Sequence, residues 1–283
     1  MRIKYNIFAS NNKQIKCNIM KRIIVVIVLA LCCINLTHAQ LGRIRVDRAV
    51  EAVSAGVQSF TITDADIAKY ADEYMKWMDA NNPVCKTTDS DPGKKFYADR
   101  LANIVSQIPA DLMQSLNLNI QAYYVVDVNA FACPNGDIRI FAALMELMTD
   151  EQILSVIGHE IGHIANTDSK DAFVTALRVS ALKDAVGAVG GNTAAALTNS
   201  QLGELAEAMA NSQYSQKQEY DADSYGFEFL KKAEKDSGSM ASALGVLLQL
   251  QEEAGAPESS KYERLFSSHP DLKRRIETLN NKK

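Results

Sequence analysis

The chain has 283 residues, of which 47% are apolar and 23% charged, so it is long enough to bury a sizeable core. Residues 1–39 carry six basic and no acidic side chains, and the remainder carries 24 basic and 34 acidic ones, a formal charge of −10. This acidic balance argues against nucleic acid and against anionic lipid as binding partners.

Residues 1–39 have the layout of a secretory signal peptide. A basic pair that starts at Lys21 precedes the apolar run Ile23–Ile34, whose 12 residues are too few to span a bilayer. The small residue Ala39 suits cleavage directly after it. We therefore predict an exported protein of the periplasm or cell envelope, with residues 40–283 as a single domain.

Two features of this leader leave alternatives open. The polar residues before Met20 are unusual for a signal peptide, so Met20 is an alternative start. The leader is either cleaved or retained as an anchor, and Cys32 or Cys33 is a candidate lipid attachment site, although the bulky Leu31 precedes them. We expect association with a membrane only if such an anchor is present.

Helices are predicted for the first part of the mature chain. Residues 43–60 are amphipathic, and Thr63 with Asp66 forms a capping box before a further helix. A third helix is predicted from Phe96 to Ile108, because Pro109 ends it.

The mature chain contains two cysteines, Cys85 and Cys133. In an exported protein such a pair favours a disulfide bond, and the alternative is two separate buried thiols.

Strands follow these helices. Residues 120–126 are rich in Tyr and Val, and a turn leads into a second strand that starts at Asp137. In that strand Ile138 and Ile140 point to one side, and Asp137 and Arg139 to the other. We predict that it is an edge strand, which pairs with an extended peptide without reading its sequence.

The sequence His159-Glu160-Ile161-Gly162-His163 is an H-E-x-x-H motif in a segment that Thr149 caps. Positions four apart lie on one face of a helix, so both imidazoles reach one metal ion. The carboxylate of Glu160 lies about a quarter-turn away, where it serves a water at the metal. Gly158 and Gly162 both cost helix stability, which indicates close approach of another backbone or of substrate.

The region 171–210 is rich in Ala, Val, Gly and Ser, and we predict a helical hairpin that packs over the core. Downstream, Glu219 and Asp223 are four apart on a predicted helix and share a face. One carboxylate can bind the metal while the other orients a ligand. Without the upstream motif, a solvated acidic face would be the favoured interpretation.

These motifs resemble the zinc endopeptidases typified by the CAAX prenyl protease and the HtpX-like proteases, closest to their soluble exported members. Glu219-Tyr220-Asp221-Ala222-Asp223 fits the E-x-x-A-D motif of that family, and His269-Pro270 with Arg275-Ile276 fits its H-P-x-x-x-x-R-I element. Asn129-Ala130-Phe131-Ala132 and Gly136–Ile140 resemble its substrate-side edge strand.

The resemblance implies one zinc ion per chain, held by His159, His163 and Glu219, and hydrolysis of peptide bonds in protein substrates. Glu160 would act as the general base. We expect a mostly helical α+β domain of the zincin type with a small sheet.

His269 would stabilise the oxyanion or occupy the open position of the zinc as a gate; alternatively, His269 caps the last helix. Asp223 and Arg275 are expected to pair and to clamp that helix to the zinc-binding helix. The rival functions are an inactive zinc-binding chaperone or scaffold and a zinc hydrolase of small molecules. The intact Glu160 argues against the first, and the edge strand against the second.

Overall fold

The computed structural model describes residues 62–185, 196–254, 265 and 268–282. The predicted signal peptide over 1–39 and the amphipathic helix over 43–60 therefore lie outside the described residues. Contacts group Thr61–Lys283 as one compact unit. No helix within the described ranges combines the length and apolar character that a membrane span needs.

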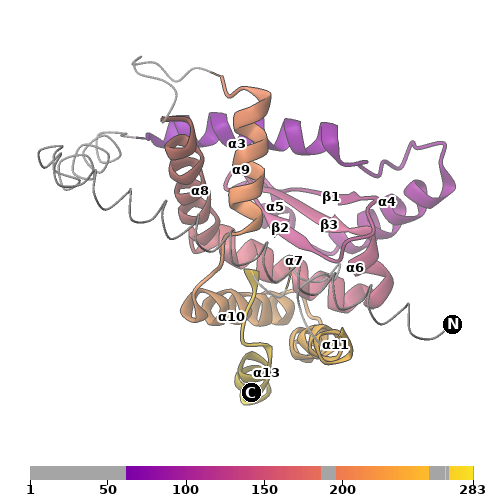
Figure 1. Cartoon of the computed structure of the whole chain (residues 1–283). Helices are drawn as coiled ribbons and strands as arrows, with labels where there is room; N and C mark the ends of the chain where they lie inside the picture. Colours follow the sequence, from indigo (N-terminus) through magenta and orange to yellow (C-terminus); the bar gives the residue numbers. More distant parts are fainter. Residues whose placement is uncertain (1–61, 186–195, 255–264, 266–267, 283) are drawn as a thin grey trace, which may run out of the picture. The chain divides into compact units, whose positions relative to one another are not determined.

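The described helices are α3 (Asp64–Asn81), α4 (Pro92–Val105), α5 (Ala110–Ser115), α6 (Ala142–Leu147), α7 (Asp150–Ala165), α8 (Asp168–Ala185), α9 (Asn199–Ala210), α10 (Gln216–Lys232), α11 (Gly238–Ala254) and α13 (Leu272–Asn280) (Figure 1). The strands are β1 (Asn119–Tyr123), β2 (Ala130–Ala132) and β3 (Asp137–Phe141). Mostly helical structure with one small sheet confirms the predicted α+β zincin-like class.

The sheet has the strand order β1-β3-β2, with β1 parallel and β2 antiparallel to β3. The prediction that Asp137–Phe141 is the edge strand was therefore wrong. It is the central strand, and all five of its residues are buried. Alternation of side chains shows which faces a strand presents, but it does not show how many neighbours the strand has. The strand at the edge of the sheet near the metal centre described below is β2. It belongs to Asn129–Ala132, the other segment that the family resemblance indicated.

Arg139 on β3 is a structural residue in this arrangement. Its guanidinium is 1% exposed and donates to both carboxylate oxygens of Asp79 on α3, each at 3.0 Å. Asp137 lies 2.9 Å away on the same strand, and Tyr123 donates its hydroxyl proton to Asp79 at 2.6 Å. Because buried charges must be paired, this cluster ties α3 to the sheet.

Helix α7 lies between the sheet and the helices α10 and α11, and every residue from Ile153 to His163 is buried (Figure 1). The expected close approach at the glycines is confirmed. A Cβ atom on Gly162 would lie 3.0 Å from the Cα atom of Ala222, and one on Gly158 would lie 3.2 Å from the Cα atom of Gly226. The helices α7 and α10 thus pack almost backbone to backbone.

A second cluster of buried side chains joins α3, α8 and α9. Helices α8 and α9 pack against each other, and this confirms the predicted hairpin in the described part of residues 171–210. Lys170 on α8 pairs with Asp64 on α3, and the backbone of Leu197 donates to Glu73.

The predicted disulfide was wrong, because Cys85 and Cys133 are both free, buried thiols. They belong to different hydrophobic clusters: Cys85 packs in the main core and Cys133 in the cluster of α3, α8 and α9. Burial raises the pKa of the Cys85 thiol to about 11 and raises that of Cys133 further. Cysteine number alone does not fix the distance between two thiols, and here each one acts as a small apolar side chain.

Candidate metal centre

The side chains of the two motif histidines, both on α7, come close to each other at their Nε2 atoms. A capping box between Thr149 and Gln152 starts this helix, as predicted, and sets its turns. His159 and His163 follow one turn apart, and their Nε2 atoms are 3.1 Å from each other. Both side chains are buried, so neither nitrogen is surrounded by bulk water.

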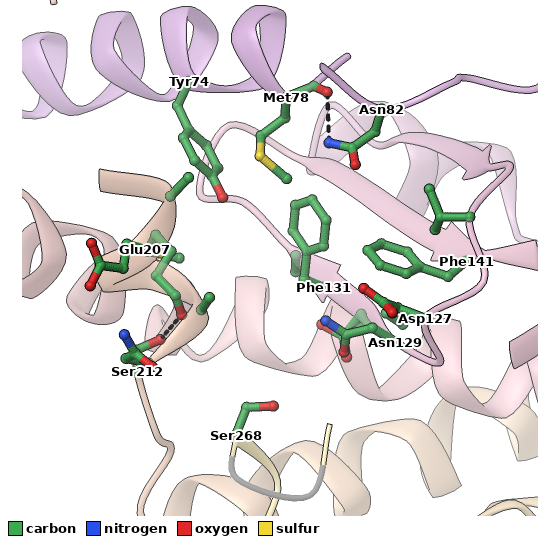
Figure 2. A pocket seen from close by; sticks show the side chains of 18 of the residues that line it. Tyr74, Met78, Asn82, Asp127, Asn129, Phe131, Phe141, Glu207, Ser212 and Ser268 are labelled. Carbon is green, nitrogen blue, oxygen red and sulfur yellow. Dashed lines mark hydrogen bonds between the residues drawn. The ribbon is translucent and has the colours of Figure 1, made fainter. Parts of the chain in front are cut away.

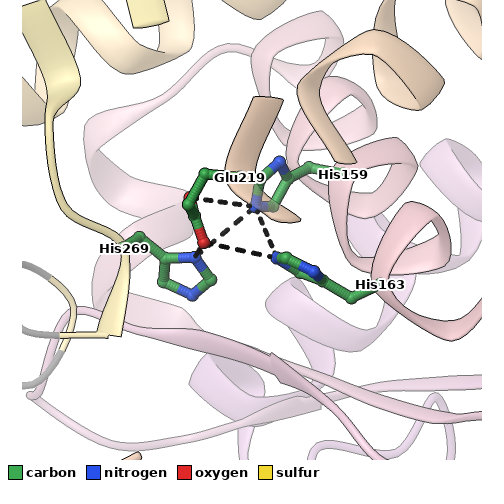
Figure 3. Close-up of side chains that lie close together, drawn as sticks. All are labelled: His159, His163, Glu219 and His269. Carbon is green, nitrogen blue, oxygen red and sulfur yellow. Dashed lines mark hydrogen bonds and ion pairs between the residues drawn. The ribbon is translucent and has the colours of Figure 1, made fainter. Parts of the chain in front are cut away.

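Helix α10 contributes the third candidate metal ligand, Glu219. The Oε1 atom of Glu219 lies 3.5 Å from Nε2 of His163, and its Oε2 atom lies 3.7 Å from Nε2 of His159. His269, just before α13, brings its Nδ1 atom to 3.0 Å from Glu219 and 3.4 Å from His159. One ligand atom from each of the four buried residues lies within 4.8 Å of the others (Figure 3).

This cluster fits a zinc ion. Two ligands at about 2.05 Å from a tetrahedral zinc are roughly 3.3 Å from each other, and the spacings between the three donors of His159, His163 and Glu219 bracket that value. Two imidazole nitrogens and a carboxylate oxygen are also the donor set of catalytic zinc sites. Two buried imidazole Nε2 atoms that lie 3.1 Å apart, with the Glu219 carboxylate beside them, are explained by a cation between the three side chains.

A carboxylate contacts the Nδ1 atom of each of the two histidines, His159 and His163, and orients its ring. Nδ1 of His159 lies 2.9 Å from Asp223, and Nδ1 of His163 lies 3.0 Å from Asp168. Such partners fix the ring so that its other nitrogen faces the metal. The sequence indicated Asp223 but not Asp168, which opens α8 after a turn in which Thr167 has a φ of 65°. No pattern in the sequence marks an aspartate five residues beyond the motif.

Arg275 on α13 completes this arrangement. Its guanidinium donates two hydrogen bonds of 2.7 Å to Asp223 and also contacts the carboxylate of Glu219. The predicted Asp223–Arg275 pair is present and joins α13 to α10. The alternative of a capping role for His269 was wrong, since α13 begins at Leu272 with Asp271 as its N-cap residue.

The electrostatics of the cluster favour a cation. Burial raises the pKa of the Glu219 carboxyl, but the neighbouring His269, His163 and Arg275 outweigh it and hold that pKa far below its usual range. The same balance lowers the pKa of Asp223, where Arg275 and His159 oppose burial. For His163, burial is outweighed by the hydrogen bonds that its ring donates to the carboxylates of Asp168 and Glu219, and these raise its pKa to about 9. Both carboxylates therefore stay ionised at neutral pH.

Glu160 is 2% exposed and lies with its Oε1 atom 4.0 Å from Nε2 of His269. Both residues line a cleft of about 500 Å³ between α3, α9 and β2 (Figure 2). Aromatic and sulfur-containing side chains form much of its wall, among them Tyr74, Met78 and Phe131. All three residues of β2 also line this cleft.

Tyr214, which sequence reasoning missed, joins two parts of the site. Its ring stacks on His163 with centroids 3.8 Å apart and planes 13° apart. Its backbone N–H donates to the carbonyl of Ser268 at 3.3 Å, next to His269. The segment before α10 therefore holds both the zinc-facing ring of His163 and the chain segment that carries His269.

The comparisons with known proteins agree with this site. The sequence matches Peptidase family M48 over residues 99–283. It is 32% identical to metalloprotease LoiP of Escherichia coli over 213 residues, 75% of this chain and 79% of the relative. It is 30% identical to metalloprotease YcaL of the same organism over 231 residues, 81% of this chain and 85% of the relative.

The chain therefore belongs to peptidase family M48, whose members are zinc-dependent. It is a metalloprotease, a hydrolase that acts on protein or peptide substrates.

Proposed function

We propose that this protein is an exported zinc endopeptidase that cleaves envelope proteins, misfolded ones included. One zinc ion per chain is held by His159, His163 and Glu219. The observation that carries the proposal is the position of Glu160: its carboxylate lies 4.0 Å from His269, which adjoins this donor set, and it lines a cleft that the edge strand β2 also lines. A protein that only stores metal needs no base at that point.

The bound zinc would polarise the peptide carbonyl and lower the pKa of a water at its open position. Glu160 accepts the proton of the attacking water and returns it to the amine that leaves. Asp223 and Asp168 keep the two imidazoles in the orientation that the ligand role needs. Glu160 is 2% exposed, which limits the access of other water molecules to its carboxylate.

His269 has two roles in this proposal. Turned toward the substrate, its imidazole stabilises the oxyanion that forms at the scissile carbonyl. Turned toward Glu219, as in Figure 3, its Nδ1 atom lies where a fourth zinc ligand would lie and closes the site until substrate arrives. Imidazole is a good zinc ligand, so a resting state of this kind is chemically reasonable.

Substrate is presented by β2. In the described part of the chain this strand has a neighbouring strand on one side only, and its residues line the cleft. An extended peptide that pairs with its outer edge would be bound through its main chain, with little dependence on sequence. Such binding suits an enzyme that degrades unfolded polypeptides.

Location and subfamily rest on the sequence. The signal peptide over residues 1–39 would deliver the protein to the periplasm or cell envelope, either free or anchored through Cys32 or Cys33. The H-P-x-x-x-x-R-I element supports the HtpX-like type. Fractionation of cells that express the full chain would test the location, and recovery of the protein in the cytoplasm would contradict it.

The activity is tested with casein and purified protein. We expect hydrolysis that a chelator stops and that added zinc restores. Glu160→Gln should lose at least ~100-fold in activity, the low end for a general base, while zinc remains bound. Substantial activity in the zinc-loaded variant would contradict the role of Glu160, and a wild type without proteolytic activity would favour the chaperone or scaffold.

A further inference from the structure

Glu160 and His269 line two hollows of very different size. One is the cleft of about 500 Å³, and the other is a hollow of about 30 Å³. Ala130 of β2, Glu160 and His269 line both. We propose that the small hollow is a specificity pocket, which restricts one of the two residues that flank the cleaved bond to a small aliphatic side chain.

The walls of the small hollow are apolar. Seven of the lining residues are buried members of the main core: Ala130, Leu144, Val156, Met240, Leu244, Leu247 and Leu265. The polar residues, His159, Glu160, His269 and Arg275, are those of the metal centre. A polar side chain that entered would lose its hydration among leucines, and this is unfavourable without a hydrogen-bond partner.

The size of the hollow limits what it can hold. Its volume of about 30 Å³ accommodates roughly two water molecules, so a methyl or isopropyl group fits and an aromatic ring does not. Apart from Leu265, the apolar walls come from β2, α6, α7 and α11 in a close-packed core, so the hollow does not widen on those sides without moving the core.

The path of the substrate explains why the two hollows act on different residues. This step rests on the proposed function, in which an extended peptide lies along the outer edge of β2. Successive side chains of such a peptide point to opposite sides. The two side chains that flank the cleaved bond therefore do not enter the same hollow: in this proposal one enters the large cleft, and its neighbour enters the small hollow.

The experiment compares two leucines of the same core. Leu247 on α11 lines the small hollow, whereas Leu154 on α7 is buried in the same cluster and lines neither hollow. Leu247→Ala and Leu154→Ala thus remove the same side chain at similar burial. Melting temperature and zinc content are measured first, and Leu247→Val is a milder variant if Leu247→Ala does not fold.

Each purified protein digests a proteome-derived peptide library, and mass spectrometry identifies the cleavage sites. We expect the wild type to select Ala or Val at one flanking position and to accept large residues at the other. Leu247→Ala should raise kcat/KM at least ~10-fold for peptides with Leu or Phe at the selective position, relative to Ala. Val156→Leu, which fills the hollow, should lower cleavage at Val more than at Ala. Leu154→Ala should keep the wild-type profile.

Binding gives a readout without turnover. In the Glu160→Gln background, the ratio of Kd values for peptides with Ala and with Phe at that position should shift in the same direction when Leu247→Ala is added. A wild type that accepts bulky residues at both flanking positions, or a profile that Leu247→Ala leaves unchanged, would overturn the inference while the protease activity stands. If the wild type cleaves no peptide, the proposed function fails and this inference fails with it.

Discussion

Replacing Arg139 by Met should destabilise the fold without weakening substrate binding. The guanidinium is 1% exposed and pairs with Asp79 and Asp137, so its removal leaves two carboxylates without their cation. Breaking a buried ion pair on one side costs about 3–5 kcal/mol. The side chain of Asp79 is 32% exposed and regains part of its hydration, so we expect about 3 kcal/mol. For a unit of this size the melting temperature would fall by roughly 6–12 °C.

The assay is urea unfolding in the presence of a chelator, so that zinc binding does not add to the measured stability. The single tryptophan, Trp77, reports on α3, the helix that carries Asp79. Arg274→Met is the matched control, because that side chain is 67% exposed and its nearest carboxylate lies 3.9 Å away; its effect should stay within about 0.5 kcal/mol. A loss below ~1 kcal/mol for Arg139→Met, or a raised KM with unchanged stability, would refute the structural role and favour a substrate-facing strand.

Three further changes test the metal centre. Glu219→Ala should lose zinc together with activity, because a catalytic zinc site needs three protein ligands; near-stoichiometric zinc by metal analysis would place the third ligand elsewhere. His269→Ala should keep its fold and zinc but change turnover, slower if oxyanion support dominates and faster on unfolded substrates if gating dominates. Identical kinetics on folded and unfolded substrates would exclude both roles. Gly162→Ala should weaken zinc affinity, because the new Cβ atom would lie 3.0 Å from the backbone of α10. Gly245→Ala, with no atom within 4 Å, should leave affinity unchanged and stabilise helix α11 by up to about 1 kcal/mol. Equal zinc affinities in the two glycine variants would contradict the close packing of α7 and α10.

The sequence predicted well those features that depend only on residues close together in the chain. The capping boxes at Thr63 and Thr149 need only four consecutive residues at the start of a helix, and both are present. The spacing of His159 and His163 needs only the pitch of a helix. Helical periodicity does not predict that Glu219 joins these two histidines at the metal. The E-x-x-A-D motif of the family predicted that third ligand.

The features that sequence reasoning missed depend on pairing between distant segments. The central place of β3 follows from β1, which lies parallel to it after a long connection, and alternation within one strand contains no information about that neighbour. The separation of Cys85 and Cys133 depends on which helices cover which part of the sheet. Asp168 reaches His163 only because the chain turns sharply at Thr167.

The glycines at the contact between α7 and α10 connect the local motif to the assembled site. The spacing of a helix places two imidazoles near one metal position. A glutamate side chain from a neighbouring helix can reach that position only if the two helix axes are close. At Gly158 a Cβ atom would lie 2.6 Å from the ring of Phe229, and at Gly226 one would lie 3.1 Å from the backbone of α7. A side chain at either position would push the helices apart and carry Glu219 with α10. The glycines weaken the helices as isolated elements, by roughly 1 kcal/mol each, and in return they allow the short distance that the metal centre requires.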